Sequence, residues 1–126
     1  MLNKRVTIAY ADLNASFAGE YIQIDPSMEI TMGTTVTGVV KKTVYPLDIQ
    51  IINDTGVEIE YNPVISVEEY AMYSGTNPPV LQRLQKSGIL QSDYTNFPKC
   101  YKFLVKAREA SASKDLIIEF LNYDFS

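Results

Sequence analysis

The sequence predicts an antiparallel β-sandwich or jelly roll of about seven or eight strands, with a short helical insertion around 66–90. Two observations predict this fold class. Short segments of alternating apolar and polar residues recur along the chain, separated by Gly, Pro, Asn and Asp. Helical spacing combined with capping residues occurs within 66–90. The 126 residues suffice for one domain, so we expect a single β-sandwich domain over 1–126.

The first expected strand covers residues 5–10. Alternation places Val6, Ile8 and Tyr10 on one face, because successive side chains of a strand point to opposite sides. This pattern is typical of a strand with one face against a core, and it predicts that the tyrosine belongs to that face.

Two further strands are expected over 21–25 and 28–36, on either side of a Pro-Ser pair that suits a turn. The second strand ends in a β-branched run, which favours a pleated, half-buried surface. Gly33 and Gly38 flank that run. Glycines inside such a pattern predict a bulge or a close approach of another backbone.

The strongest local pattern spans 47–61, where we expect a short-loop hairpin. Two alternating segments, 47–51 and 57–61, flank the sequence Asn-Asp-Thr-Gly at 53–56. Asn and Asp tolerate tight turns and Gly supplies a positive φ, so the four residues suit a hairpin loop. Each segment has one apolar and one polar face, which is typical of an antiparallel sheet covered on one side.

The helical insertion begins where Ser66 and Glu69 have the spacing of a capping box. The preceding residues are β-branched, so we expect a strand that runs into a helical turn. Asn77 is expected to cap a second helix with proline in its first turn, ended by Gly88. The buried stripe of that helix would be Val80, Leu81 and Leu84. The segment 87–98 is expected to be irregular.

Two strands are expected to close the chain. The segment 101–106 has one apolar face and one mixed basic face. The segment 116–123 is apolar on both sides apart from Glu119, which is typical of a central strand covered on both faces. A Ser/Ala-rich loop over 108–114 would connect them.

The composition excludes several kinds of chemistry. The chain contains no His and one Cys, so neither a disulfide within one chain, nor a Cys/His zinc site, nor a histidine-based catalytic triad can form. We therefore expect no enzymatic activity, no cofactor and no catalytic or metal-binding residues. The lone thiol, Cys100, is expected to act as a small, partly buried hydrophobe.

Three acidic residues are the candidates for a cluster of carboxylates. Glu58 and Glu60 share a strand face and could meet Asp48 across the expected hairpin. Paired carboxylates can hydrolyse glycosides or bind Ca²⁺, but a solvated or interface face explains the same spacing, and we favour that explanation. The sequons at Asn14 and Asn53 are interpreted as ordinary turn residues, because no export signal precedes them.

The net charge of −4 argues against general binding to nucleic acid or to anionic membranes, because phosphate affinity needs a dominant basic surface. No apolar run reaches the length of a membrane span. One basic stretch, 99–114, could contact packaged nucleic acid or a partner. We favour pairing with acids such as Glu58 and Glu60 in its own sheet, since opposite charges across strands attract.

Four segments together resemble a known group of proteins. They are Ile-Asn-Asp-Thr-Gly (52–56), Val-Glu-Ile-Glu-Tyr (57–61), Tyr-Lys-Phe-Leu-Val-Lys-Ala (101–107) and Leu-Ile-Ile-Glu-Phe-Leu-Asn-Tyr (116–123). The pattern resembles small β-sandwich virion proteins of bacteriophages, of the capsid-vertex, head-completion and head–tail connector types. The resemblance implies a non-enzymatic structural subunit that is made in the host cytoplasm and becomes part of the virion. Its partners would be copies of itself and other virion proteins.

A second class of function stays open. Nine tyrosines suit both protein interfaces and sugar-binding platforms, because a tyrosine offers a flat ring and a wet hydroxyl. A carbohydrate or cell-surface binding module would use exposed rings; the candidates are Tyr61, Tyr70, Tyr73 and Tyr94. Coplanar exposed rings in a shallow groove would favour this second class, whereas uncovered sheet edges or apolar patches would favour assembly.

Overall fold

The computed structural model describes residues 3–86, 92–96 and 99–125, and for 92–96 it describes the backbone alone. In chain order the elements are β1 (Lys4–Ile8), α1 (Tyr10–Ser16), β2 (Ile22–Ile24), β3 (Met28–Thr35), β4 (Gly38–Ile52), β5 (Ile59–Val64), α2 (Val67–Tyr73), β6 (Arg83–Gln85), β7 (Ser92–Asn96), β8 (Lys102–Ala107) and β9 (Leu116–Asp124).

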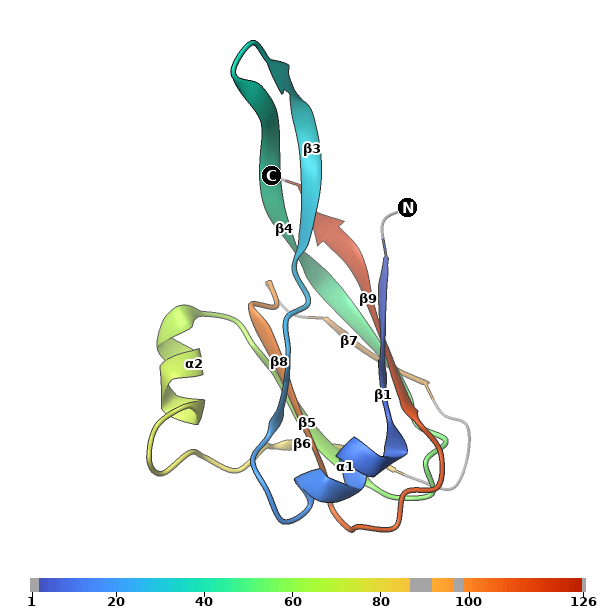
Figure 1. Ribbon diagram of the computed structural model, residues 1–126. Helices are drawn as coiled ribbons and strands as arrows, with labels where there is room; N and C mark the ends of the chain where they lie inside the picture. The colour runs from blue at the N-terminus through green and yellow to red at the C-terminus, as the bar shows by residue number, and fades with distance from the viewer. Residues whose placement is uncertain (1–2, 87–91, 97–98, 126) are drawn as a thin grey trace.

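The chain folds as an antiparallel β-sandwich, as the sequence predicts (Figure 1). One sheet has the order β1-β9-β4, and both β3 and β7 pair with β4, along different parts of it. The other sheet has the order β2-β8-β5-β6. Apolar residues from the inner faces of both sheets fill the space between them, and Ile49, Phe103 and Phe120 are fully buried there.

A second, smaller hydrophobic cluster lies on the outer face of the β2-β8-β5-β6 sheet. Val64, Leu81 and Leu104 are buried in it. Tyr70 and Tyr73, both on α2, pack against it together with one tyrosine that precedes β2. This sheet is therefore covered on both faces, and α2 is the element that covers the outer one.

The capping-box prediction is confirmed. The Ser66 Oγ accepts a hydrogen bond from the Glu69 backbone N–H at 3.1 Å, and α2 begins at the next residue, Val67. The Glu69 carboxylate reaches back to the Ile65 N–H at 3.1 Å. The chain therefore passes from β5 into α2 within three residues, as the sequence predicts.

The predicted second helix is wrong. Residues 78–86 form no helix, and β6 pairs with β5 instead, with Ile59 opposite Gln85. Of the three predicted stripe residues only Leu81 is buried, whereas Val80 and Leu84 are exposed. Pairing with the open edge of β5 satisfies more of the backbone N–H and C=O groups of this segment than one turn of helix could. The predicted stop, Gly88, lies outside the described residues.

The predicted hairpin over 47–61 is also wrong. The first alternating segment lies in β4 and the second enters β5 at Ile59, but β4 and β5 belong to different sheets and do not pair. Residues 53–58 instead cross from one sheet to the other. Alternation shows which side chains face the core, and that requirement is met equally by a hairpin and by a crossover between facing sheets.

The predicted first strand, residues 5–10, ends earlier than the sequence predicts, and residues 10–16 form a helix. β1 stops at Ile8, and α1 follows, so Tyr10 is half exposed at a helix start and not on the strand's core face. Leu13 is the buried anchor of α1. The Asp115 carboxylate accepts a hydrogen bond from the Tyr10 N–H at 2.9 Å, which stabilises the helix start.

The last two predicted strands are present as β8 and β9. β9 is central, between β1 and β4, as predicted. Its outer face is less covered than predicted, because Ile117, Glu119 and Leu121 are only partly buried. The segment expected to be irregular contains β7, which pairs with residues 48–52 of β4.

Candidate functional site

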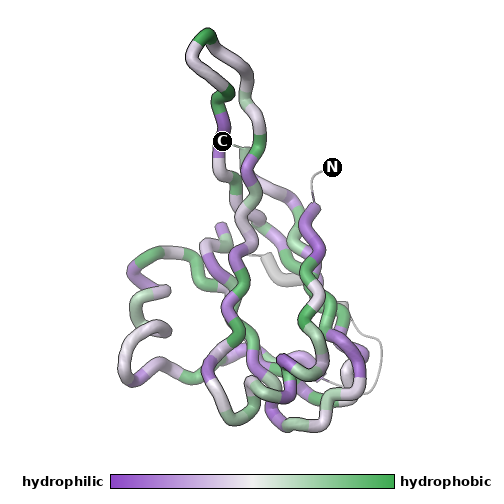
Figure 2. Tube along the Cα trace, in the orientation of Figure 1, coloured by the Kyte–Doolittle hydropathy of each residue, from purple (hydrophilic) through white to green (hydrophobic). Residues whose placement is uncertain are grey.

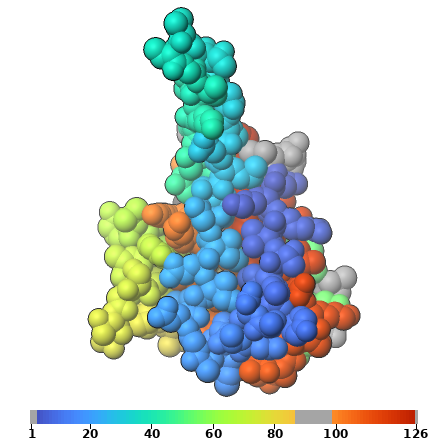
Figure 3. All heavy atoms as spheres, in the orientation of Figure 1, coloured from blue at the N-terminus to red at the C-terminus, as the bar shows by residue number. Residues whose placement is uncertain are grey.

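A long hairpin of β3 and β4 extends well beyond the two sheets (Figure 1). Its base packs on the core, where Met28 lies opposite the buried Val44. We call residues 29–43 the arm. The space-filling view shows the end of the arm standing clear of the rest of the molecule (Figure 3). Its tip is the two-residue connection between Thr35 and Gly38.

The arm carries apolar side chains that touch little of their own chain. The exposed fraction is 106% for Val36 at the tip, 56% for Met32, 54% for Val39 and 45% for Val40. The hydropathy colouring shows hydrophobic residues at the end of the arm (Figure 2). Single exposed apolar residues are common on protein surfaces. Four of them on one hairpin are more than this scattered exposure explains.

The two glycines that interrupt the predicted strand lie in the arm. The pairing register of β3 with β4 shifts between Thr31 and Gly33, so the predicted bulge is confirmed. Gly38, at the tip, has a φ of +149°, and a Cβ built there would meet nothing within 4 Å. The alternative prediction, a close approach of another backbone, is therefore wrong for Gly38.

Polar contacts fix the lower part of the arm. The Lys41 ammonium lies 3.2 Å from the Glu29 carboxylate across the two strands. The Lys42 Nζ donates to the backbone oxygen of Phe125 at 2.6 Å, which ties the arm to the end of β9. These contacts hold the arm at its root and leave its end without such support.

A pocket of about 310 Å³ opens at the root of the arm. Its lining residues are Tyr45, Ile65, Ser66, Val67, Lys99 and Tyr101. We call it the base pocket. The rings of Tyr45 and Tyr101 stack with centroids 6.2 Å apart, and the Lys99 ammonium lies 6.0 Å from the centroid of the Tyr45 ring. Ile65 and Val67 contribute exposed apolar side chains.

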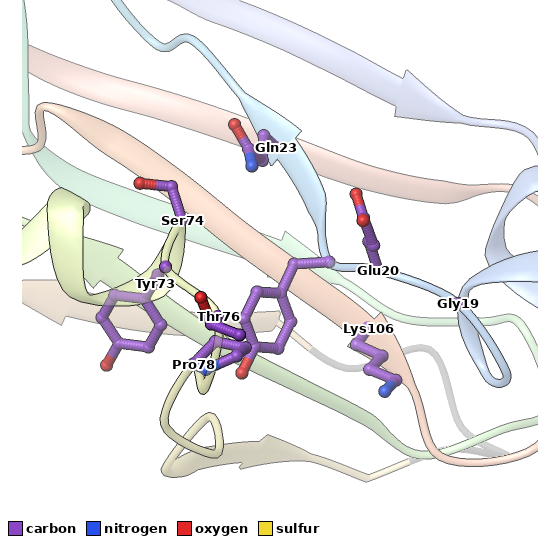
Figure 4. Close-up of a pocket in the computed structure, with 10 residues that line it drawn as sticks. Gly19, Glu20, Gln23, Tyr73, Ser74, Thr76, Pro78 and Lys106 are labelled. Carbon is purple, nitrogen blue, oxygen red and sulfur yellow. The ribbon is translucent and has the colours of Figure 1, made fainter.

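A larger cleft, of about 520 Å³, lies between the edge strand β2 and the loop that follows α2. We call it the side cleft (Figure 4). Its lining is mixed, with glycines, aromatic rings, hydroxyls, one acid and one base: Gly19, Glu20, Tyr21, Gln23, Tyr73, Ser74, Gly75, Thr76, Pro78 and Lys106.

Two tyrosines form the aromatic part of the side cleft. The Tyr21 and Tyr73 rings meet edge to face, with centroids 6.0 Å apart. The Tyr21 hydroxyl donates to the Pro79 carbonyl, and the Tyr73 hydroxyl accepts from the Asn62 amide at 3.0 Å. Burial, followed by the proximity of Tyr73 and Glu60, raises the pKa of Tyr21. Both rings are therefore held in place, and the raised pKa keeps the Tyr21 hydroxyl protonated at neutral pH.

The predicted tyrosine platform is only partly assembled. Tyr61 is buried in the core at 2% exposure, so it cannot stack on a ligand. Tyr70 and Tyr73 lie together on α2, and Tyr73 lines the side cleft. The side chain of Tyr94 lies outside the described residues. Tyr21, which lines the cleft, was missed because its role depends on α2 and not on its neighbours in sequence.

The structure separates the three acids that the predicted hairpin would have joined. Asp48 lies in the sheet of β4, where it accepts from the Asn122 amide. Glu58 and Glu60 lie in or next to β5, in the other sheet. Asp48 therefore does not meet Glu58 and Glu60 as the predicted hairpin would require.

The basic stretch 99–114 pairs with acids of its own chain, as favoured above. The Arg108 guanidinium lies 2.9 Å from the Glu58 carboxylate, and Lys106 lies opposite Glu60 in the β5–β8 register. Further ion pairs join Lys99 to Asp124, Lys102 to Asp25 and Lys114 to Asp54. Much of this basic stretch is therefore already paired within the fold.

The ion pair between Lys102 and Asp25 contributes to the pKa of the Asp25 carboxyl group. Burial alone would raise the pKa of Asp25, but hydrogen bonds from Ser27 and the Lys102 ammonium, 3.5 Å away, hold that pKa below its ordinary value. The carboxylate stays ionised and anchors the turn before β3, where the Ser27 N–H donates to it at 3.0 Å.

Cys100 packs in the main core as a small hydrophobe, as predicted, but it is fully buried where the sequence predicts partial burial. Burial raises the pKa of its thiol from 9.0 to about 12, and the thiol donates to the Lys102 carbonyl at 3.2 Å. A thiol of this kind is protonated at neutral pH, and it is the thiolate that attacks an electrophile. The structure thus places the only cysteine where it can pack but not react.

The two sequon asparagines have different positions. Asn53 lies in the crossover after β4, so the turn interpretation holds there. Asn14 lies in α1, where the interpretation as a turn residue is wrong. Its amide donates to the Ala112 carbonyl at 3.1 Å and accepts from the Ala112 N–H at 2.6 Å. This side chain therefore joins α1 to the loop before β9.

No helix among the described residues is long and apolar enough to cross a membrane. Within the same residues, no group of three or more His, Cys, Asp or Glu side chains is placed to hold a metal ion. Comparisons of the chain with protein-family models, with curated protein sequences and with solved structures found no match.

Proposed function

We propose that the chain is a non-enzymatic structural subunit of a virion, at a capsid, vertex or head–tail position. It acts through protein–protein contacts with copies of itself and with other virion proteins. The observation that carries this proposal is the arm, which holds Val36, Met32, Val39 and Val40 in solvent. Burial of apolar area at such side chains is the main source of association free energy.

The remaining chemistry supports a role without catalysis. The thiol of Cys100 is buried and its pKa is raised, and the acids Asp48 and Glu60 are in separate sheets. The resemblance to small β-sandwich virion proteins supports the virion setting.

The test is association of the full chain measured by sedimentation velocity from micromolar to millimolar concentration. We expect reversible oligomers, and we expect the double variant V36T/V39T to weaken them, because threonine keeps the β-branched shape and adds a hydroxyl. V80T is the matched control, since Val80 is 66% exposed on the body. A chain that remains monomeric at millimolar concentration, and does not co-assemble with partner virion proteins, would contradict the proposal.

A carbohydrate-binding function is the second candidate, and the side cleft favours it. Tyr21 and Tyr73 provide rings, while Glu20, Gln23 and Thr76 provide polar groups in reach of sugar hydroxyls. A glycan array probed with the full chain tests this candidate. Binding that is lost in Y21A but kept in Y10A, at an exposed tyrosine outside the cleft, would support it.

A further inference from the structure

We propose that residues 66–79 form a flap that opens and closes the side cleft, held shut by the hydrogen bonds of three tyrosine hydroxyl groups. The flap contains α2 and the loop that follows it. The inference goes beyond the assembly role, because it concerns a movement within one chain. It rests on how the flap is joined to the body, on what lies beneath it and on which residues line the cleft.

The backbone of the flap belongs to neither sheet. The chain leaves β5 after Val64 and returns to the sheet at β6, and α2 stands to one side of both sheets (Figure 1). Within the part of the chain that the structure describes, no backbone-to-backbone hydrogen bond joins the flap to the rest. Side chains therefore hold the flap against the body. Such a segment opens at lower cost than a strand, which must break a ladder of backbone hydrogen bonds.

The helix of the flap forms its hydrogen bonds without the body. At its start, Ser66 and Glu69 make the capping box described above. At its end, the Ser74 N–H and the Ser74 Oγ both donate to the Tyr70 carbonyl, at 3.1 Å each. These bonds lie within the flap or join it to the residue just before it, so α2 keeps them when it moves away from the sheet. The flap can therefore move as a unit.

Three tyrosine hydroxyl groups join the flap to the body in the described structure. The Tyr70 hydroxyl donates to the Gln23 side chain on β2. The other two bonds, those of Tyr21 and Tyr73, span the same boundary and are described above. All three tyrosines are partly exposed, and the groups that they bond are uncharged. Water can replace each bond when the flap moves, so each one favours the closed state only modestly.

Burial of apolar surface also favours the closed state only modestly. Val64 and Leu104 lie beneath the flap and are fully buried, but α2 itself contributes no buried residue. Two of its apolar side chains remain in water with the flap closed, because Val67 is 62% exposed and Met72 is 61% exposed. Closure therefore gains little from these side chains.

The two walls of the side cleft lie on opposite sides of the moving boundary. Tyr73 and Thr76 line the cleft from the flap. Glu20, Gln23 and Lys106 line it from the body (Figure 4). Opening of the flap therefore widens the cleft, and a ligand that contacts both walls would shift the flap toward its closed state.

The experiment is thiol labelling of the full chain by iodoacetamide, read for each cysteine by mass spectrometry. V64C places a thiol of nearly the size of valine under the flap, and the native Cys100 of the same molecule reports opening of the main core. We expect the V64C thiol to react on the order of a hundredfold faster than Cys100, because the flap opens without the core. L104C repeats the test at the other buried position under the flap, should V64C not fold.

A second variant tests the hydrogen bonds that hold the flap. Y70F removes the hydroxyl that bonds Gln23, and it should speed labelling of the V64C thiol by about two- to tenfold while leaving Cys100 unchanged. Y10F, at an exposed tyrosine outside the flap, should change neither rate.

The outcomes separate the flap from the proposed function. Equal rates for the V64C thiol and Cys100 would overturn the flap, because the outer cluster would then open only with the whole fold. A rate that Y70F leaves unchanged would overturn the role of the hydroxyl groups. Neither result bears on association through the arm, which sedimentation velocity tests separately.

Discussion

The Asn53 side chain organises the crossover between the two sheets. Its amide nitrogen lies 3.0 Å from the Val57 carbonyl, 3.3 Å from that of Gln85 and 3.1 Å from that of Lys86, and its oxygen accepts from Thr55. Asn53 and Thr55 are both fully buried. Buried carbonyl groups need hydrogen-bond donors, and here the Asn53 amide supplies them both to the crossover and to the end of β6.

Replacing this side chain should therefore be costly. We expect N53A to lower the free energy of unfolding by about 3 kcal/mol, because several buried carbonyls lose their donor. Urea unfolding followed by far-UV circular dichroism measures the loss. N77A, at an exposed asparagine in the loop after α2, is the matched control and should change stability by less than about 0.5 kcal/mol. Equal losses in the two variants would contradict this role.

The buried thiol of Cys100 gives a dependence on pH. Its pKa is raised from 9.0 to about 12 in the folded chain, so between these values the unfolded chain loses a proton that the folded chain keeps. The contribution of this thiol to the free energy of unfolding is fully present below pH 9 and falls as pH rises toward 12, by about 1 kcal/mol per pH unit. Urea unfolding at pH 8 and pH 10.5 measures the fall, and it should be smaller in C100A. An identical fall in C100A would show that other groups, such as Tyr123, cause it.

At the scale of elements, the sequence predicted strands better than it predicted their partners. The alternation in 47–51 and 57–61 identified most of the inward residues, because that depends on local period alone. Ile49, Ile51, Val57, Ile59 and Tyr61 are buried, whereas Leu47 is only partly buried. Whether those strands join one sheet or two depends on β7, β8 and β9, which are distant in sequence. The same limit explains β6, where an open edge of β5 outweighed the helix-start pattern at Asn77.

The candidate site was likewise predicted only where it depends on local sequence. The glycines and β-branched residues of the arm predicted an interrupted strand, and the structure contains it. The sequence did not show that this strand leaves the body, because exposure depends on the absence of a facing sheet. Nor did it show the base pocket, which joins Tyr45, Val67 and Tyr101 from three separate elements or loops.

α2 should be the element most sensitive to its cap. It has seven residues and none is fully buried, so its packing on Val64 and Leu104 holds it only through partly buried tyrosines. We expect S66A to cost about 1 kcal/mol locally and to speed amide exchange at Tyr70, whose N–H bonds the Ser66 carbonyl. Hydrogen exchange read residue by residue measures this. S111A, at an exposed serine outside α2, should leave the exchange of Tyr70 unchanged.

At the scale of the whole molecule, charge is divided between an arm at 2 − 1 = +1, from Lys41, Lys42 and Glu29, and a remainder at −4 − 1 = −5. Two copies that associate through their arms each carry −4, so they repel one another at low salt, and added ions screen this repulsion. Salt should therefore strengthen association of the full chain. Burial of apolar side chains favours the same trend for salts such as sulfate.

K41Q/K42Q and K86Q/K114Q each change the net charge of the chain from −4 to −6, the first in the arm and the second on the body. Sedimentation velocity should show weaker association of both variants than of the parent chain at low salt, and the difference should shrink as salt rises, because added ions screen the larger repulsion. If salt instead weakens association of the parent chain, attraction between opposite charges, and not burial of the apolar side chains of the arm, holds the copies together.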